Sequence, residues 1–333
     1  MKYKKQLLFF LYNIIVLLLL FSLLELFVRV SFPGIQLPGT SSELIYPNKY
    51  GSTHGLNPNA SGLSNGVFKK VNGEGFWEYS GNSNQADTSD AIMILGDSAT
   101  MGIGVEDDST FAGIISRLLP KKHILNPSLI AYTVNDYLNV VNYLIDSTGN
   151  KFNIKHLLIC WCLNDVYPNH PVENAPGVVE EDLLSILVKF IRNNFETYQW
   201  LKTTFADRSE SYYMYDKEYY SYDNSDFTRS VGAINKIKQV AGVYNINLEV
   251  VILPYEYQIR NFDNNDIRQP QHILASKLSE YNIKTIDVSS AFRQFQTSSS
   301  SLYLYGDGIH FSRLGHKTAA QFIFNNIFRD SKN

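Results

Sequence analysis

Cysteine is scarce in this chain, and the patterns that hold a metal ion are missing. The only two cysteines, Cys160 and Cys162, lie in the apolar stretch HLLICWCL, which is typical of a buried strand. A disulfide between strand residues two apart would be strained, and two thiolates do not complete a zinc site. The seven histidines show no HExxH or other paired ligand spacing. We therefore expect both cysteines in the core, and we predict neither a metal nor any other cofactor.

An excess of positive charge is also lacking. The chain has 29 lysines and arginines against 32 acidic residues, a net charge of −3, so nucleic acid is not an expected partner. The Gly-Ile-Gly at 102–104 lacks the third glycine and the acidic partner of a dinucleotide-binding fingerprint. Hydrophobic residues make up 44% of the chain, which indicates a folded globular protein and not a disordered one.

Charge is absent altogether from residues 7–24, LLFFLYNIIVLLLLFSLL, a run long enough to cross a bilayer as a helix. A signal peptide would have a shorter run and a small-residue cleavage site, and the following ELFVRVSFPG offers none. We therefore expect residues 1–30 to be a retained membrane anchor. Three lysines precede the run, which predicts a cytoplasmic N-terminus and places residues 31–333 outside the cytoplasm. Glu25 and Arg29, four apart, are expected to pair.

The rest of the chain divides by composition at about residue 90. Residues 31–90 are rich in Gly, Ser, Asn and Pro, which predicts a loop-like linker and N-terminal extension with one short hairpin near VFKKVNGEGFWEY. From residue 91 to 330, apolar strands alternate with helices. The predicted strands are 91–95, 123–126, 156–163, 248–254 and 284–288. The predicted helices are 110–119, 133–146, 180–195, 227–244, 269–281 and 312–328. This alternation predicts a three-layer α/β/α sandwich around a five-stranded parallel sheet.

Six tyrosines fall within residues 212–222. One interpretation is a surface that stacks on sugars or lies at a membrane interface. The interpretation that we favour is a tyrosine-rich surface loop that packs on its own domain.

Polar side chains follow the predicted strands at the edge where parallel sheets bind ligands. Ser98 follows the first strand within IMILGDSATMGIGV, Ser128 follows the second in Asn-Pro-Ser, and Asn164 follows the third. Asp307 and His310 lie in GDGIHFS, directly before the last predicted helix. A serine, an asparagine, an acid and a histidine from four separate loops are therefore expected to converge at one edge.

This set of residue types suits acyl transfer. A serine hydroxyl needs a base, which His310 can supply through one ring nitrogen, while Asp307 can hold the other. The oxyanion that forms on the attacked carbonyl needs hydrogen-bond donors aimed at it. The backbone N–H groups of Ser98 and Ser128 and the side chain of Asn164 are the predicted donors of this oxyanion hole.

On these residues the sequence resembles the SGNH, or GDSL-type, hydrolases. The stretches GVEDDSTFAGII and VVILPYEYQIR also resemble membrane-anchored bacterial members. The four blocks of that family match LGDSATMGIGV, NPSLIAYT, CLND and DGIHFSRLGH. The resemblance covers about residues 91–328 and implies a flavodoxin-like fold. It also implies that Ser98 is the nucleophile, His310 the general base, Asp307 its partner and Asn164 an oxyanion donor.

Two positions depart from the family pattern. Ser128 and Cys162 stand where the blocks usually carry glycine. A backbone N–H survives the change from glycine to serine, but serine would be strained if that position needs a positive φ.

The expected function is that of an extracytoplasmic, membrane-anchored serine esterase. It would hydrolyse an acyl or acetyl ester on a cell-envelope glycan or lipid through an acyl-enzyme. Transfer to a sugar hydroxyl instead of water remains open, because both reactions use the same triad. The alternative is a catalytically degenerate member of the same fold that binds glycan for an assembly complex.

Overall fold

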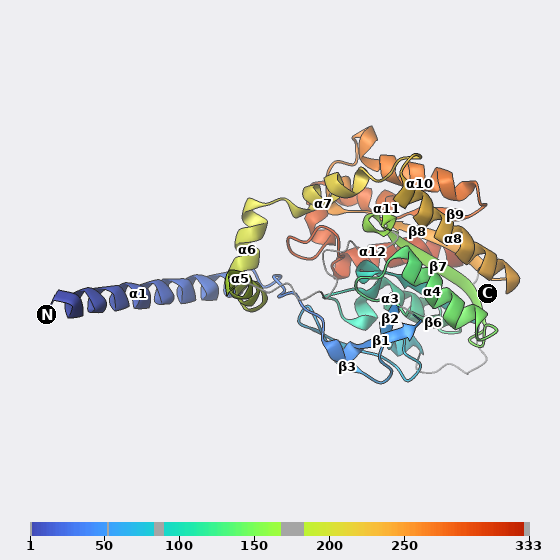
Figure 1. Ribbon diagram of the computed structural model, residues 1–333. Coiled ribbons are helices and arrows are strands. Elements are labelled where there is room, and N and C mark those ends of the chain that lie inside the picture. The colour runs from blue at the N-terminus through green and yellow to red at the C-terminus, as the bar shows by residue number, and fades with distance from the viewer. Residues whose placement is uncertain (1, 52, 83–89, 168–182, 330–333) are drawn as a thin grey trace.

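A five-stranded parallel sheet forms the centre of the fold (Figure 1). The computed structural model describes residues 2–51, 53–82, 90–167 and 183–329. The spatial order of the strands is β6-β5-β7-β8-β9. Their bounds are β5 Ala91–Gly96, β6 His123–Leu125, β7 Ile154–Cys162, β8 Asn247–Leu253 and β9 Lys284–Asp287. All four neighbouring pairs are parallel, as the apolar runs predicted.

The strand order reverses direction at β5. The chain passes from β5 to β6 on one side and then crosses to β7 on the other, so the loops after β5 and β7 diverge at a topological switch point. Ligands of open parallel sheets bind beyond the carboxyl ends of the strands at such a point. The loops after β5 and β7 carry Ser98 and Asn164, respectively.

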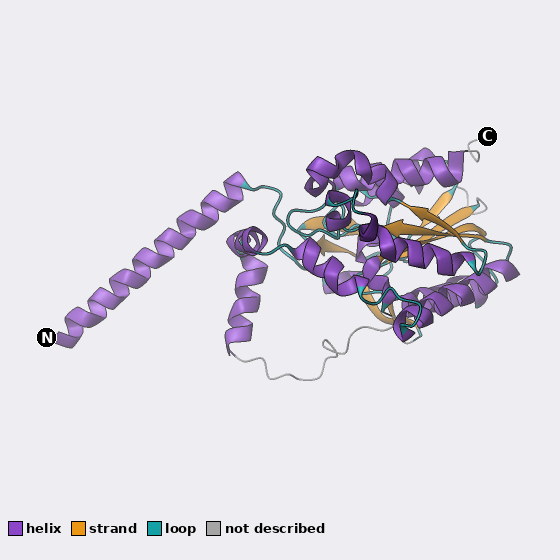
Figure 2. Cartoon of the chain, turned by 90° about the horizontal axis from the view of Figure 1, so that it is seen from above, coloured by secondary structure: helices purple, strands orange, loops and turns teal. Residues whose placement is uncertain are grey.

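Helices cover both faces of the sheet, which confirms the predicted three-layer sandwich (Figure 2). α3 packs with α12, while α8 contacts both α4 and α10. Their bounds are α3 Phe111–Leu118, α4 Val134–Val141, α8 Ser225–Val243, α10 Gln269–Ser279 and α12 Arg313–Ile323. Short helices follow three strands: α2 Ser98–Met101, α9 Glu256–Arg260 and α11 Ser289–Phe292. Cys160 and Cys162 are free and buried in β7, as expected for core residues.

The segment before the sheet differs from the loop-like linker that its composition suggested. It forms two hairpins, one from β1 Ile45–Tyr50 and β2 Thr53–Leu56, the other from β3 Ser61–Ser64 and β4 Val67–Lys70. Seven of its apolar side chains join the core of the sheet domain: Leu44, Tyr50, Leu56, Val71, Phe76, Trp77 and Tyr79. The domain boundary at residue 90 stays a prediction, but residues 44–79 do not behave as a linker.

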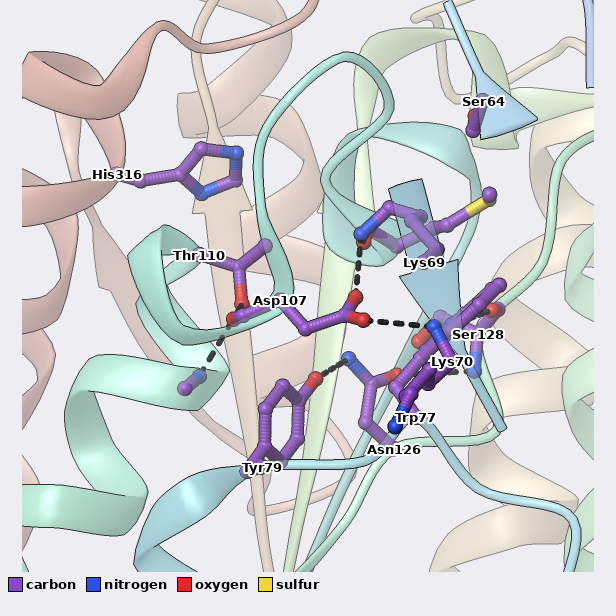
Figure 3. A network of polar contacts seen from close by, with 12 residues as sticks. Ser64, Lys69, Lys70, Trp77, Tyr79, Asp107, Thr110, Asn126, Ser128 and His316 are labelled. Carbon is purple, nitrogen blue, oxygen red and sulfur yellow. Dashed lines mark hydrogen bonds and ion pairs between the residues drawn. The ribbon is translucent and has the colours of Figure 1, made fainter. Parts of the chain in front are cut away.

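Lys69 of β4 ties this extension to the loop after α2. Its ammonium is fully buried, lies 2.6 Å from Asp107 and donates to the Met101 carbonyl at 3.3 Å. Figure 3 shows Lys69 and Asp107 pointing toward one another. The Trp77 ring lies 5.0 Å from the ammonium, and its indole N–H donates to the Ser128 carbonyl at 2.8 Å. One buried cluster therefore connects the extension to two of the loops that were predicted to carry the site.

The N-terminal helix α1, Lys2–Ser31, projects away from the sheet domain (Figure 1). Over Tyr3–Ser31 it is long and apolar enough to cross a membrane by length and composition, and none of its most apolar window is buried. Near its end Arg29 pairs with Glu25 at 2.7 Å, as the spacing predicted. The Glu25 carboxylate also accepts the backbone N–H groups of Glu196 and Thr197, so it caps the start of α6, Glu196–Phe205.

The tyrosine-rich segment is mostly helical, which corrects the expected loop. Helix α7 spans Arg208–Lys217. Tyr213 and Tyr220 are buried in the core cluster, whereas Tyr215 and Tyr222 are more than half exposed. Tyr220 receives the indole N–H of Trp161 and donates to the Leu163 carbonyl, both at 2.8 Å. The segment therefore packs on its own domain, as the favoured interpretation held.

We expect Lys69→Met to lower the free energy of unfolding by roughly 3–5 kcal/mol. The substitution leaves the Asp107 carboxylate, whose side chain is only 12% exposed, without its counter-charge. Urea unfolding of the full chain in detergent would measure the loss.

Two comparisons sharpen this test. Replacing both partners, Lys69→Met with Asp107→Leu, should recover much of the stability, because no buried charge is then left unpaired. Lys277→Met breaks the exposed pair with Glu280 and should cost no more than about 1 kcal/mol. A Lys69→Met chain as stable as the unaltered one would contradict the argument.

Candidate active site

Ser98 lies at the sharp turn from β5 into α2. Asp97 precedes the helix as its N-cap, and its carboxylate accepts the Ala99 N–H at 2.9 Å. The strand ends on Gly96 because a side chain does not fit there: a Cβ would lie 2.1 Å from the Thr100 hydroxyl and 2.8 Å from the Cys160 carbonyl. The turn therefore holds Ser98 at the carboxyl edge of the sheet.

Ser98, His310 and Asp307 form one hydrogen-bonded chain. The Ser98 Oγ lies 2.9 Å from His310 Nε2, and His310 Nδ1 lies 2.9 Å from Asp307 Oδ1. The same carboxylate oxygen accepts the backbone N–H of His310 at 2.7 Å. These contacts fix the imidazole between the hydroxyl and the carboxylate, which is the geometry of a nucleophile, a base and an orienting acid.

Charge and burial act on the imidazole in opposite directions. Burial alone would lower the pKa of His310, but the Asp307 carboxylate outweighs it and raises that pKa above its usual value. For Asp307, burial opposes ionisation, and the adjacent His310 together with its hydrogen bonds holds the pKa of the carboxyl below its usual range. Asp307 is therefore ionised at neutral pH, where it stabilises the imidazolium that proton transfer creates.

The loop that carries Asp307 depends on its two flanking glycines. Gly306 and Gly308 have φ of 61° and 80°, a left-handed conformation that favours glycine. A Cβ at Gly308 would lie 2.4 Å from the Cβ of Ser209, and one at Gly306 would lie 2.1 Å from the Thr203 hydroxyl. The loop that carries Asp307 can therefore lie directly against the end of α6 and the start of α7.

A second histidine of the fourth motif, His316, has a different environment. It is fully buried, and its Nδ1 accepts the Phe111 N–H at 3.2 Å. Burial lowers the pKa of His316 to about 3, so its ring stays neutral. In Figure 3 its ring lies above Thr110 and apart from the Lys69–Asp107 pair. His310 is the histidine that contacts the serine.

Asn164 lies on the turn after β7 and faces the Ser98 loop. Its Nδ2 donates to Asp97 Oδ2 at 3.3 Å. Burial raises the pKa of Asp97 above its usual value, although the nearby His310 and the hydrogen bonds to the carboxylate act to lower it. The neighbouring Asp165 is buried and accepts the Cys162 N–H and the Tyr137 hydroxyl, both at 2.8 Å. Sequence reasoning assigned no role to Asp97 or Asp165. Asp97 lies in the first motif and contacts Asn164 directly, whereas Asp165 lies in the third motif and ties the end of β7 to Tyr137.

Ser128 does not occupy the position that the sequence suggested. Its N–H already donates to Asn126 Oδ1 at 2.9 Å, and its Oγ accepts the Gly96 N–H at 3.0 Å. The residue is fully buried. The residue of this loop that adopts a positive φ is Ala131, three positions later, with φ of 68°. Ala131 is exposed, and among the described residues its N–H has no hydrogen-bond acceptor.

Cys162 causes no backbone strain in place of glycine. Its φ of −94° and ψ of 157° are those of ordinary extended chain, and its side chain is buried in the core cluster. As for metals, the described ranges hold no group of three His, Cys, Asp or Glu side chains that could bind an ion.

Comparisons with known proteins give structural similarity only. No family model and no curated protein matches the sequence. The chain is similar to a member of the lipolytic G-D-S-L family from Veillonella parvula, with 14% identity over 72% of this chain and 98% of that one, at a TM-score of 0.42. It is also similar to TesA, with 10% identity, 72% and 98% coverage and a TM-score of 0.44. A third similar structure is the acetylxylan esterase Axe2 from Geobacillus stearothermophilus. It is 13% identical over 73% of this chain and 97% of that one, at a TM-score of 0.44.

The lipolytic G-D-S-L protein carries the name of the family whose motifs the sequence resembles. All three TM-scores lie below 0.5, so the assignment of the fold rests on the strand order and helix layers of this chain itself.

We expect Asp307→Asn to lower the pKa of the His310 imidazole, because the carboxylate that raises it is removed. NMR titration of the His310 ring measures this shift without reference to activity. Since the base acts in its neutral form, the acidic limb of ester turnover should move to lower pH, and kcat should fall by about 10⁴-fold.

Asp263→Asn is the matched control, because it removes an exposed carboxylate whose ion-pair partner among the described residues is Arg293. It should leave the His310 titration unchanged. An unchanged titration in the Asp307 variant would show that this carboxylate does not govern the base.

Proposed function

We propose that this chain is a serine carboxylic ester hydrolase with Ser98 as its nucleophile. The observation that carries the proposal is the continuous hydrogen-bonded chain from Ser98 through His310 to Asp307. A fold of this class hosts many activities, so the site, and not the fold, supports the assignment.

The proposed reaction passes through an acyl-enzyme. Ser98 Oγ attacks the ester carbonyl while its proton moves to His310 Nε2. The tetrahedral intermediate then breaks its bond to the alcohol, which leaves with that proton. A water molecule attacks the acyl group, gives a proton to the imidazole, and the second collapse releases the acid and restores the Ser98 hydroxyl.

Three N–H groups are the proposed donors to the oxyanion. The Ser98 N–H has no acceptor among the described residues, and the Asn164 amide has a second N–H beyond the one that Asp97 receives. For the third donor we replace Ser128 by Ala131, because the Ser128 N–H is already committed to Asn126.

The proposed substrate is an ester on a cell-envelope glycan or lipid, with O-acetyl groups on a polysaccharide as the first choice. The apolar helix α1 motivates this choice, because a chain anchored in a membrane lies next to the polymers of the cell envelope. Transfer of the acyl group to a sugar hydroxyl remains the alternative reaction. A non-catalytic, glycan-binding role is a second alternative because Ser128 and Cys162 replace glycines. Neither residue has a positive φ, so neither replacement strains the backbone, and this alternative has less support.

We also propose that α1 anchors the catalytic domain to a membrane. Helix α5, Leu183–Asn194, has no buried residue and lies near α1 (Figure 1). Six of its large apolar side chains are exposed: Leu183, Leu184, Ile186, Leu187, Val188 and Phe190. Phe195, which follows α5, packs edge-on against Phe21 of α1 with ring centroids 5.0 Å apart. Phe21 belongs to the uncharged run at residues 7–24, so this contact brings the end of α5 to the membrane-crossing part of α1. The exposed apolar face of α5 then lies on the same bilayer.

Ser98→Ala should lower turnover of p-nitrophenyl acetate by roughly 10⁴–10⁶-fold without unfolding the domain, because only the attacking hydroxyl is removed. A fluorophosphonate probe should label the unaltered chain at Ser98. Ser279→Ala, which removes an exposed hydroxyl on α10, is the control and should keep full activity and labelling. Equal turnover in the Ser98 variant would refute the assignment, and a folded unaltered chain with neither labelling nor turnover would favour the non-catalytic alternative.

The membrane proposal predicts that carbonate washing leaves the full chain in the membrane fraction, because an apolar helix of this length stays in the hydrocarbon. Protease added outside the cell should digest the catalytic domain and spare a tag at the N-terminus. Release of the mature chain into the medium would overturn the anchor, and protection of the domain would reverse the orientation.

A further inference from the structure

A cavity of about 360 Å³ lies directly beside the catalytic loop. Residues from the segment after α1, from α5, α6 and α7, and from the Asp307 loop line it together. The side chains that matter for its chemistry are Gln36, Arg192, Lys202, Arg208, Tyr212 and Asp307. Through Asp307, the cavity adjoins the chain of hydrogen bonds that ends on Ser98.

Positive charge dominates this cavity. Arg192, Lys202 and Arg208 line it, and in the described parts of the chain none of the three has an ion-pair partner. Burial is the main cause that lowers the pKa of Lys202, and the charges of Arg208 and Arg192 lower it further. The three cations are therefore close enough to repel one another. Asp307 is the only acidic side chain in the lining, and its carboxylate is already bound to His310. A cluster of unpaired cations favours an anionic ligand.

Two further groups in the lining have unused hydrogen-bonding capacity. The Gln36 amide donates to the Gly104 carbonyl at 2.8 Å, while its buried Oε1 has no donor among the described residues. Arg208 is held by the Tyr212 hydroxyl at 2.9 Å, yet its buried Nε likewise has no acceptor in the described ranges. Because both of these atoms are buried, the groups that a ligand in the cavity would meet are the cationic side chains, which suit an anionic acceptor.

We propose that this cavity binds an acidic sugar residue of the substrate, with the sugar's carboxylate or phosphate facing Arg192 and Lys202. The proposal deepens the esterase assignment and rests on it, since it places the neighbouring, ester-bearing sugar at Ser98. Arginine forks match carboxylates and phosphates in two-point contacts. The position of the cavity favours a glycan over the headgroup of an anionic phospholipid, because Asp307 connects its lining through His310 to Ser98 and a bound sugar would adjoin the ester-bearing one.

The test measures binding in the absence of turnover. The full chain carrying Ser98→Ala, in detergent micelles, is titrated with tetragalacturonate and with neutral maltotetraose by calorimetry. We expect tighter binding of the acidic tetrasaccharide. The double substitution Arg192→Gln and Lys202→Gln should weaken that binding at least about tenfold and leave the neutral sugar unaffected. The control removes the same charge elsewhere, through Lys317→Gln and Arg229→Gln, and should bind like the parent chain.

Each other outcome overturns the proposal. Equal binding of both sugars, or unchanged affinity in the double variant, rules out an anion subsite. If the double variant loses binding to phosphatidylglycerol vesicles but keeps its affinity for tetragalacturonate, the cluster contacts lipid and not glycan. Because binding is measured without Ser98, a failure here is separate from a failure of the esterase assignment, which is tested by turnover and probe labelling of the unaltered chain.

Discussion

The imidazole of His310 lies between a hydroxyl and a carboxylate, and the other features of the site serve to hold it there. Asp307 can face the ring because Gly306 and Gly308 turn the loop through conformations that other residues rarely adopt. The same glycines let the loop lie against residues 203–209. The position of the loop that holds His310 is therefore limited by a segment about one hundred residues earlier in the chain.

The opposite side of the site is held by the N-terminal extension. Lys69 reaches the loop after α2 through Asp107 and the Met101 carbonyl, while Trp77 holds the Ser128 carbonyl. An unpaired charge in this position would be costly, so the salt bridge makes the docking of the extension specific. Residues 44–79 thus pack as part of the sheet domain, although their composition resembles that of a linker.

Contacts between α1 and α6 link the N-terminal helix to the site. The Glu25 carboxylate of α1 caps α6, and α6 in turn leads into the residues packed behind Asp307. The cationic cavity lies between these helices and the catalytic loop. If α1 anchors the chain as proposed, the cavity and the triad are held near the membrane surface by a short series of direct contacts, where polymers of the envelope are within reach.

The sequence by itself determined the sheet and the convergence of the site. Apolar runs define strands, and parallel strands place their carboxyl ends at one edge, so Ser98 and Asn164 could be located from order alone. The pairing of Glu25 with Arg29 followed from helical spacing. These inferences succeed because they rest on local periodicity and on a rule that holds for every parallel sheet.

Only the tertiary structure decided which groups in those loops are free to act. The expectation for Ser128 failed because the Asn126 side chain takes its N–H, whereas Ala131 adopts the left-handed conformation. Nor could spacing unite Gln36, Arg192 and Lys202 in one cavity. Hydrogen-bond partners and pocket linings depend on contacts between distant segments, and such contacts leave no periodic trace in the chain.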